Sequence, residues 1–157
     1  MSRTPTQNNI LRHIAIIMDG NRRWAKKHFF QAMEGHRRGY NKLIEVIRWC
    51  VHENIQVLTV YAFSSENWNR KPEEVEYLMD LLREALRDEK DEFNENSVRV
   101  KIIGEKNRFA KDIQDLISQI ELRTSKNTKI TLQLALSYGG RQELVQAVKR
   151  IAQAVEA

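Results

Sequence analysis

The chain has 157 residues, which is the length of a single domain and enough to bury a hydrophobic core. Hydrophobic residues make up 41% and charged residues 30%, a balance typical of soluble domains, and no apolar run approaches the roughly 20 residues that span a bilayer. The single cysteine, Cys50, excludes an intramolecular disulfide framework and fits a reducing cytoplasm. We therefore expect a cytoplasmic protein with a flexible N-terminal arm over residues 1–10 and one domain over residues 11–157.

The net charge of +5 is unevenly distributed along the chain. Residues 1–42 contain nine Lys and Arg against two acidic residues, a net charge of +7, whereas the remainder contains 17 against 19, a net charge of −2. This concentration of positive charge favours one anionic ligand near the N-terminal region over a diffuse affinity for nucleic acid.

The first predicted element is a buried strand over residues 14–18, a continuous apolar run. It ends in the turn triplet Asp19-Gly20-Asn21, in which glycine accepts a positive φ. Four cations follow in the start of a helix: Arg22, Arg23, Lys26 and Lys27. Helix N-termini and arginines attract phosphate, and a carboxylate beside phosphate calls for a hard divalent cation such as Mg²⁺. The alternative is that Asp19 caps the helix and the cations form a solvated face.

Residues 28–33 show no clear period and are expected to form a loop that carries Phe29 and Phe30. Gly35 and His36 open a helix with apolar residues at helical spacing, which we expect to end near Asn54. Beyond it, β-branched and aromatic runs predict strands over residues 55–63, 98–103 and 129–136. The intervening apolar stripes predict helices that run from Pro72 through Phe93, from about Arg108, and after Arg141.

This alternation of strands and helices predicts an α/β fold, with a mostly parallel central sheet flanked by helices on both faces. The crossovers are expected to be right-handed, and ligands are expected beyond the carboxyl ends of the strands. Three of these ends carry polar side chains and would meet at one edge of the sheet: residues 19–21, 64–70 and 137–141.

The sequence contains no Gly-rich phosphate loop, no dinucleotide fingerprint and no zinc-ligand spacing. An anion site remains, with Arg23 and Arg70 as candidates for phosphate contacts and with Asn21, Ser64 and Asn67 as uncharged hydrogen-bonding groups. Three further residues have alternative roles. His36 binds phosphate, acts as an acid, or is a structural hydrogen-bonding group; Trp68 walls an apolar slot or covers the core; Glu74 positions a substrate group or interacts with the helix dipole.

Three motifs then identify a resemblance: His13-x-Ala-x-x-Met-Asp-Gly-Asn-x-Arg-Trp-Ala, Gly35-His36-x-x-Gly39, and Tyr61-Ala-Phe-Ser-Ser-Glu-Asn-Trp-x-Arg70. Together they resemble the cis-prenyltransferases, typified by bacterial undecaprenyl diphosphate synthase, and the resemblance extends from Leu11 over essentially the whole chain. It implies the Mg²⁺-dependent condensation of isopentenyl diphosphate with an allylic diphosphate of farnesyl type, giving a cis-polyprenyl diphosphate. It also implies a homodimer for the full-length protein, with peripheral membrane contact during product release and no nucleic acid partner.

The resemblance implies a role for each matching residue. Asp19 would engage Mg²⁺ and the diphosphate, and Asn67 would join it as a catalytic residue. The implied substrate-binding residues are Gly20, Asn21, Arg23, Trp24, His36, Phe63, Ser64, Ser65, Trp68, Arg70 and Glu74. The helix after Pro72 and Ala62 would line a dry tunnel for the growing chain, and Phe29 and Phe30 would form part of a lid.

The chain departs from the family pattern in three places. Arg22 stands where many bacterial members have glycine, and Ala32 stands where many have an arginine for the allylic diphosphate, so Arg22, Arg37 or Arg38 would have to supply that contact. The chain also stops at Ala157, before the Arg-x-Ser-Gly-Glu block that binds isopentenyl diphosphate. We therefore expect it to bind the allylic substrate at best, to turn over poorly, and to aggregate through an incomplete sheet. The alternatives are a non-catalytic partner subunit and a basic nucleic-acid-binding module.

Overall fold

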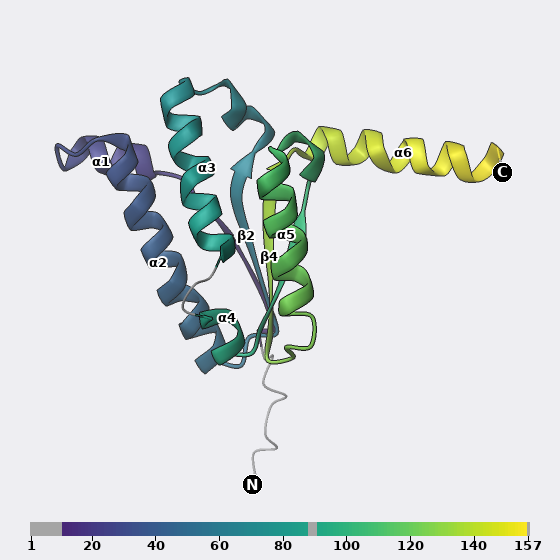
Figure 1. Ribbon diagram of the computed structural model, residues 1–157, viewed down its shortest axis with the longest axis horizontal. Helices are drawn as coiled ribbons and strands as arrows, with labels where there is room; N and C mark the ends of the chain where they lie inside the picture. Colours follow the sequence, from purple (N-terminus) through teal and green to yellow (C-terminus); the bar gives the residue numbers. More distant parts are fainter. Residues whose placement is uncertain (1–10, 88–90, 157) are drawn as a thin grey trace, which may run out of the picture.

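The computed structural model describes residues 11–87 and 91–156, so the N-terminal arm expected over residues 1–10 lies outside the described residues. Four strands of this described part form one sheet in the order β1-β2-β4-β3, and every neighbouring pair is parallel (Figure 1). The strands are β1 (His13–Ile17), β2 (Val57–Ser64), β3 (Val98–Ile103) and β4 (Ile130–Tyr138). The predicted α/β class and parallel sheet are therefore confirmed.

Within the described residues, six α-helices and two short 3₁₀ helices connect and follow these strands. They are α1 (Asn21–Lys27), α2 (Ala32–His52), η1 (Ser65–Asn69), α3 (Pro72–Arg87), α4 (Glu92–Glu95), η2 (Lys106–Arg108), α5 (Lys111–Arg123) and α6 (Gly140–Glu156). The single helix expected from Pro72 through Phe93 is divided, because Phe93 belongs to α4 and Asp91 before it has a positive φ of 52°. None of the helices in the described part of the chain is long and apolar enough to cross a membrane.

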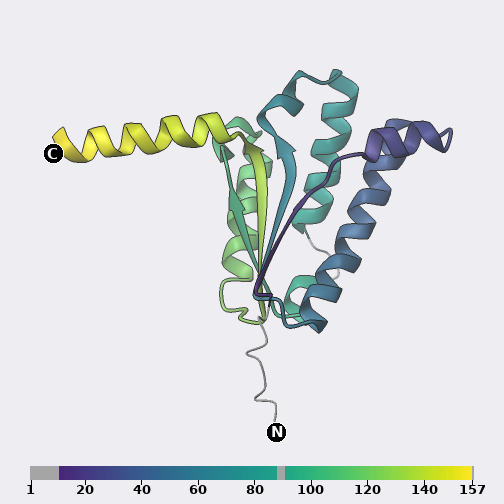
Figure 2. The same ribbon diagram turned by 180° about the vertical axis from the view of Figure 1, so that it is seen from behind.

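The main helices lie over one face of the sheet instead of two. The opposite views in Figures 1 and 2 place α2, α3 and α5 on the same side, and α6 projects away from the sheet. The covered face is apolar: in β3, buried Val98 and Val100 alternate with exposed Arg99 and Lys101. Such one-sided alternation is the pattern of a sheet with one packed face.

The packing of the helices on one face determines the handedness of the connections. The connection from β2 to β3 passes β4, whereas the connection from β3 to β4 steps back across the sheet. Helices α3 and α5 nevertheless lie on the same face and are joined by an ion pair in which Arg83 Nε lies 2.6 Å from Asp112 Oδ2. The two crossovers therefore have opposite hands, and one departs from the expected right-handed rule. Helix α5 lies on the face of the sheet that offers apolar partners, and it buries Ile113 and Ile117 there.

The parallel register brings the polar strand ends together, as the sequence predicted. Ile17 of β1 pairs with Tyr61, and Ser64 at the end of β2 pairs with Tyr138 of β4. Close packing of α1 on α2 fixes the first of these ends. A Cβ atom at Gly35 would lie 2.2 Å from the Asn21 backbone oxygen, so only glycine lets α2 approach Asn21 so closely.

Candidate active site

Asp19 lies just beyond β1, at the point where Gly20 turns the chain into α1 with a φ of +90°. Its Oδ1 atom accepts a hydrogen bond from the Gly20 N–H at 2.5 Å, and its Oδ2 atom accepts one from Arg23 Nη2 at 2.9 Å. The hydrogen bond from Arg23 and that from the Gly20 N–H lower the pKa of Asp19. The N-cap of α1 is Gly20, so the result is an ionised, exposed carboxylate and not a helix cap.

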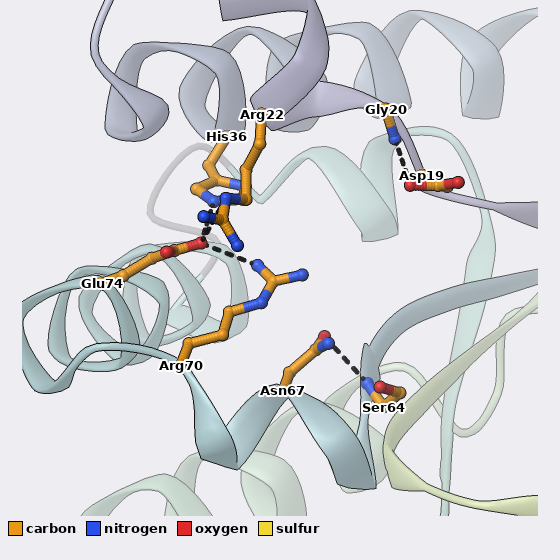
Figure 3. A network of polar contacts seen from close by, with 8 residues as sticks. All are labelled: Asp19, Gly20, Arg22, His36, Ser64, Asn67, Arg70 and Glu74. Carbon is orange, nitrogen blue, oxygen red and sulfur yellow. Dashed lines mark hydrogen bonds and ion pairs between the residues drawn. The ribbon is translucent and has the colours of Figure 1, made fainter. Parts of the chain in front are cut away.

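Glu74 is the centre of a polar network that joins three elements (Figure 3). Its Oε1 atom accepts a hydrogen bond from Arg70 Nη1 at 2.9 Å and lies 3.0 Å from His36 Nε2, and Arg22 Nε lies 3.7 Å away. Both Glu74 and His36 are buried, with 7% of each residue exposed. The network therefore ties α2 to the start of α3 and orients two arginine side chains.

Protonation states in this network follow from burial and from charge. Burial lowers the pKa of His36, although the hydrogen bond with Glu74 opposes the shift. Burial raises the pKa of Glu74, but the His36 hydrogen bond and the charges of Arg70 and Arg22 outweigh it, so the net shift is downward. We assign His36 as a neutral imidazole that donates its Nε2–H to an ionised Glu74.

Ser64 and Asn67 form a reciprocal cap at the start of η1. The Ser64 side chain accepts the Asn67 N–H, and Asn67 Oδ1 accepts the Ser64 N–H at 3.1 Å. This capping box holds the Asn67 amide at the carboxyl end of β2, close to Arg70 (Figure 3).

A basic cleft of about 510 Å³ opens beside this network. Its lining is Met18, Asp19, Gly20, Asn21, Arg22, Arg23, Lys26, Phe30, Ala32, His36 and Arg70. We call it the anion cleft. Of the three arginines that could replace an arginine at position 32, Arg22 lines the cleft, whereas Arg37 pairs with Glu84 and Arg38 pairs with Glu34.

An apolar cavity of about 290 Å³ lies between α2, α3 and the covered face of the sheet. Its lining includes Tyr40, Leu43, Ile44 and Ile47 from α2, Leu78, Met79, Leu82 and Ala85 from α3, and Phe63, Leu132 and Leu134 from the strands. The anion cleft and this cavity share five lining residues: Met18, Asp19, Asn21, His36 and Arg70. A molecule with an anionic head and an apolar tail could therefore occupy both spaces at once.

Four residues expected to bind substrate line neither space: Glu74, which contacts Arg70 instead, and Trp24, Trp68 and Ser65. Trp24 stacks on Phe30, with ring centroids 5.9 Å apart, and lines a separate cavity of about 530 Å³. Trp68 donates its Nε1–H to Ser137 Oγ at 3.1 Å and packs against Phe63, as a residue that covers the core would. Ser65 lies against Gly139, where a Cβ atom would be 2.5 Å from the serine Oγ.

Sequence reasoning also missed part of the lining. Lys26, which the sequence indicates only as one of four cations, lines the anion cleft together with the expected Arg22, and their spacing of four residues on α1 was the available signal that they share a helix face. The sequence predicts a tunnel wall from α3 and Ala62; both line the cavity, and α2 adds Tyr40, Leu43, Ile44 and Ile47. Its apolar stripe was visible in the sequence, but periodicity does not distinguish a cavity wall from packed core.

The donor set limits how a metal could be held. Within residues 11–87 and 91–156, no group of three or more His, Cys, Asp and Glu side chains could hold an ion. Asp19 is the acidic residue that lines the anion cleft, and its carboxylate is exposed there among arginines. One carboxylate fits Mg²⁺ that is shared with substrate phosphates and keeps several waters, not a cage built by protein alone.

Comparisons with known proteins show which family the chain resembles in sequence and in fold. The family model described as "Putative undecaprenyl diphosphate synthase" matches residues 17–157. The ditrans,polycis-undecaprenyl-diphosphate synthase ((2E,6E)-farnesyl-diphosphate specific) of Pseudomonas syringae pv. tomato is 44% identical over 150 residues, covering 96% of this chain and 60% of that protein. An isoprenyl transferase of Neisseria gonorrhoeae is 46% identical over 142 residues, covering 90% of this chain and 57% of that protein.

Two solved structures are similar throughout the chain. Lavandulyl diphosphate synthase from Lavandula x intermedia, in complex with dimethylallyl diphosphate, has a TM-score of 0.88 at 35% identity and covers 94% of this chain and 63% of its own. A probable undecaprenyl diphosphate synthase from Campylobacter jejuni has a TM-score of 0.72 at 34% identity, and the match covers 93% of this chain and 63% of that chain. The chain thus spans about three fifths of the length of these relatives. It belongs to the undecaprenyl diphosphate synthase family of prenyltransferases.

Proposed function

We propose that this chain carries the allylic substrate site of an isoprenyl transferase. The reaction joins isopentenyl diphosphate to an allylic diphosphate of farnesyl type and yields a cis-polyprenyl diphosphate in the presence of Mg²⁺. The relatives named as farnesyl-diphosphate-specific undecaprenyl diphosphate synthases support this choice of reaction and primer. We further propose a cytoplasmic enzyme that forms a homodimer at full length and touches the membrane when its long product leaves.

The observation that carries the proposal is the continuity of the two spaces. Four cationic side chains line the anion cleft: Arg22, Arg23, Lys26 and Arg70. The adjoining cavity is lined mainly by aliphatic and aromatic side chains. An allylic diphosphate has the same division between a doubly phosphorylated head and a hydrocarbon tail. Nucleotides and sugar phosphates lack such a tail and would leave the apolar cavity unfilled.

The side chains suit the departure of a diphosphate from an allylic carbon. Negative charge grows on the leaving group as the carbon–oxygen bond breaks, and arginines held in place stabilise it without reorganisation. Glu74 holds Arg70 toward the cleft, and the Asp19 carboxylate offers an oxygen ligand to Mg²⁺, which would neutralise further charge. The apolar cavity excludes water from the chain behind the reacting carbon.

Isothermal titration with the 157-residue chain tests the site directly. Farnesyl diphosphate should bind at least about ten times more tightly than inorganic diphosphate in the presence of Mg²⁺, because only the former fills the cavity. Equal affinities would contradict the proposal. Titration of isopentenyl diphosphate forms a separate arm, since saturable binding there would contradict the expectation that its site lies outside these residues.

A further inference from the structure

Phe29 has two unfavourable features at once. It lies in the turn between α1 and α2 with a φ of +60°, a left-handed conformation that is an outlier for a bulky side chain. It is also 98% exposed, and it lines none of the three cavities described above. Strained and exposed residues of this kind persist where they serve a function, so Phe29 calls for an apolar partner outside the chain.

Its surroundings indicate the chemistry of that partner. Lys26, Lys27 and His28 are exposed beside it, and no acidic residue occurs between Gly20 and Gln31. No ion pair is recorded for Lys26 or Lys27 with any residue that the structure describes. An exposed aromatic ring among unpaired cations matches the boundary between anionic headgroups and acyl chains.

The position of the turn fits contact with a flat surface. Figures 1 and 2 show that the α1–α2 turn projects from one side of the molecule and that α6 projects from the opposite side. Phe30, the next residue, is turned back toward Trp24 and lines the anion cleft. The turn that exposes Phe29 is therefore continuous with the mouth of the proposed prenyl site.

We propose that the α1–α2 tip, defined as Lys27, His28 and Phe29, docks onto a bilayer that contains anionic lipid. Phe29 inserts among the headgroups and Lys27 contacts their phosphates. This surface gives a location to the membrane contact proposed above. The inference rests on the proposed function in one respect: an enzyme with a lipid-like substrate works close to a membrane. Docking in the absence of substrate tests it separately from prenyl diphosphate binding.

Vesicle sedimentation combined with hydrogen–deuterium exchange tests the tip. The full chain should bind vesicles of phosphatidylcholine with phosphatidylglycerol more tightly than vesicles of phosphatidylcholine alone, and residues 26–31 should gain protection. Phe29→Gly should reduce this binding about ten-fold and Lys27→Gln about five-fold. Glycine accepts a positive φ, so Phe29→Gly should keep the fold.

Two controls separate the tip from other apolar surfaces. Leu122 of α5 is 76% exposed, so Leu122→Ser removes a matched exposed side chain and should leave vesicle binding unchanged. Helix α6 exposes Leu144, Val148 and Ile151, and its own protection is read separately in the exchange data. The proposal fails if Phe29→Gly binds anionic vesicles like the wild type, or if protection is confined to α6. It also fails if Phe29→Gly loses farnesyl diphosphate affinity alone, which would make the side chain a lid.

Discussion

Asp19 and Arg23 form an ion pair that a metal-bound diphosphate would have to open. The Asp19 carboxylate would bind the metal ion and the Arg23 guanidinium would bind the phosphate. Replacing Asp19 with alanine removes the oxygen ligand but leaves Arg23 free to contact phosphate. We predict that Asp19→Ala loses most of the gain in farnesyl diphosphate affinity that Mg²⁺ provides, about ten-fold or more. Titrations with and without Mg²⁺ measure this gain, and an undiminished gain in the variant would exclude Asp19 as the metal ligand.

Arg22 is the residue placed to compensate for Ala32, since both line the anion cleft. Arg22→Gly should weaken farnesyl diphosphate binding about ten-fold through the loss of a charged contact with phosphate. Adding Ala32→Arg to that variant should restore the affinity. Arg37→Gln is the matched control, because Arg37 is engaged with Glu84 and should not change diphosphate binding. If Arg37→Gln weakens binding as much as Arg22→Gly, the compensation is assigned to the wrong arginine.

The buried pair of His36 and Glu74 predicts how stability changes with pH. The folded pKa of His36 lies below 6.5, so the unfolded chain takes up the proton first as the pH falls below that value. The folded pKa of Glu74 lies below 4.5, and the same argument applies there. The contributions of both groups to the free energy of unfolding are therefore complete near neutral pH and are lost in acid. Thermal unfolding from pH 7.5 to 5 should show a falling Tm, and His36→Asn should flatten the slope; an unchanged slope would contradict this origin.

At the scale of elements, local pattern was sufficient for the strands and for most helices. The alternation of apolar and basic residues gave β3 its bounds, 98–103, and the polar loop after β2 was located correctly although it folds into η1. The packing of helices on one sheet face was not predicted, because the strength of the apolar runs suggested burial on both sides. The alternating Arg99 and Lys101 of β3 were the sequence signal that one face of the sheet is exposed to solvent.

The candidate site shows the same division between local and tertiary information. The motifs named Asp19, Asn21 and Arg70 because they follow strand ends in the sequence. The contribution of α2 to the cavity depends on how α2 and α3 are spaced above the sheet, which no local pattern encodes. Trp68 of η1 contacts Ser137 of β4 and does not line the cavity, so tertiary packing decides between the two roles that its sequence position allowed.

Ala85 of α3 lines the apolar cavity and offers a way to change its size. Ala85→Phe should fill part of the space that a farnesyl tail needs and reduce farnesyl diphosphate affinity about ten-fold. The affinity for inorganic diphosphate should stay the same, because the anion cleft is unchanged. Glu76→Ala, on an exposed position of the same helix, is the control. Equal losses for both ligands would mean that the substitution disturbs α3 as a whole and not the cavity.

At the scale of the whole molecule, the helix-covered face of the sheet forms the core, whereas the exposed surface of α6 favours association. The core supports the two spaces of the site, and α2, α3 and α5 pack against it. Helix α6 presents an apolar stripe to solvent, with 53–81% of each residue exposed: Leu144, Val145, Val148, Ile151 and Val155. A contiguous exposed stripe of this kind promotes association with other surfaces, including further copies of the same chain.

We therefore predict that the 157-residue chain associates in a concentration-dependent way through α6. Sedimentation velocity should show the average mass rising with concentration, and the triple substitution Leu144→Ser, Val148→Ser and Ile151→Ser should suppress the rise. The lining residues of the anion cleft and the apolar cavity all precede α6, so the triple variant should retain wild-type affinity for farnesyl diphosphate. Persistent association in the triple variant would point instead to the sheet edges, where β1 and β3 have unpaired backbone groups in the described structure.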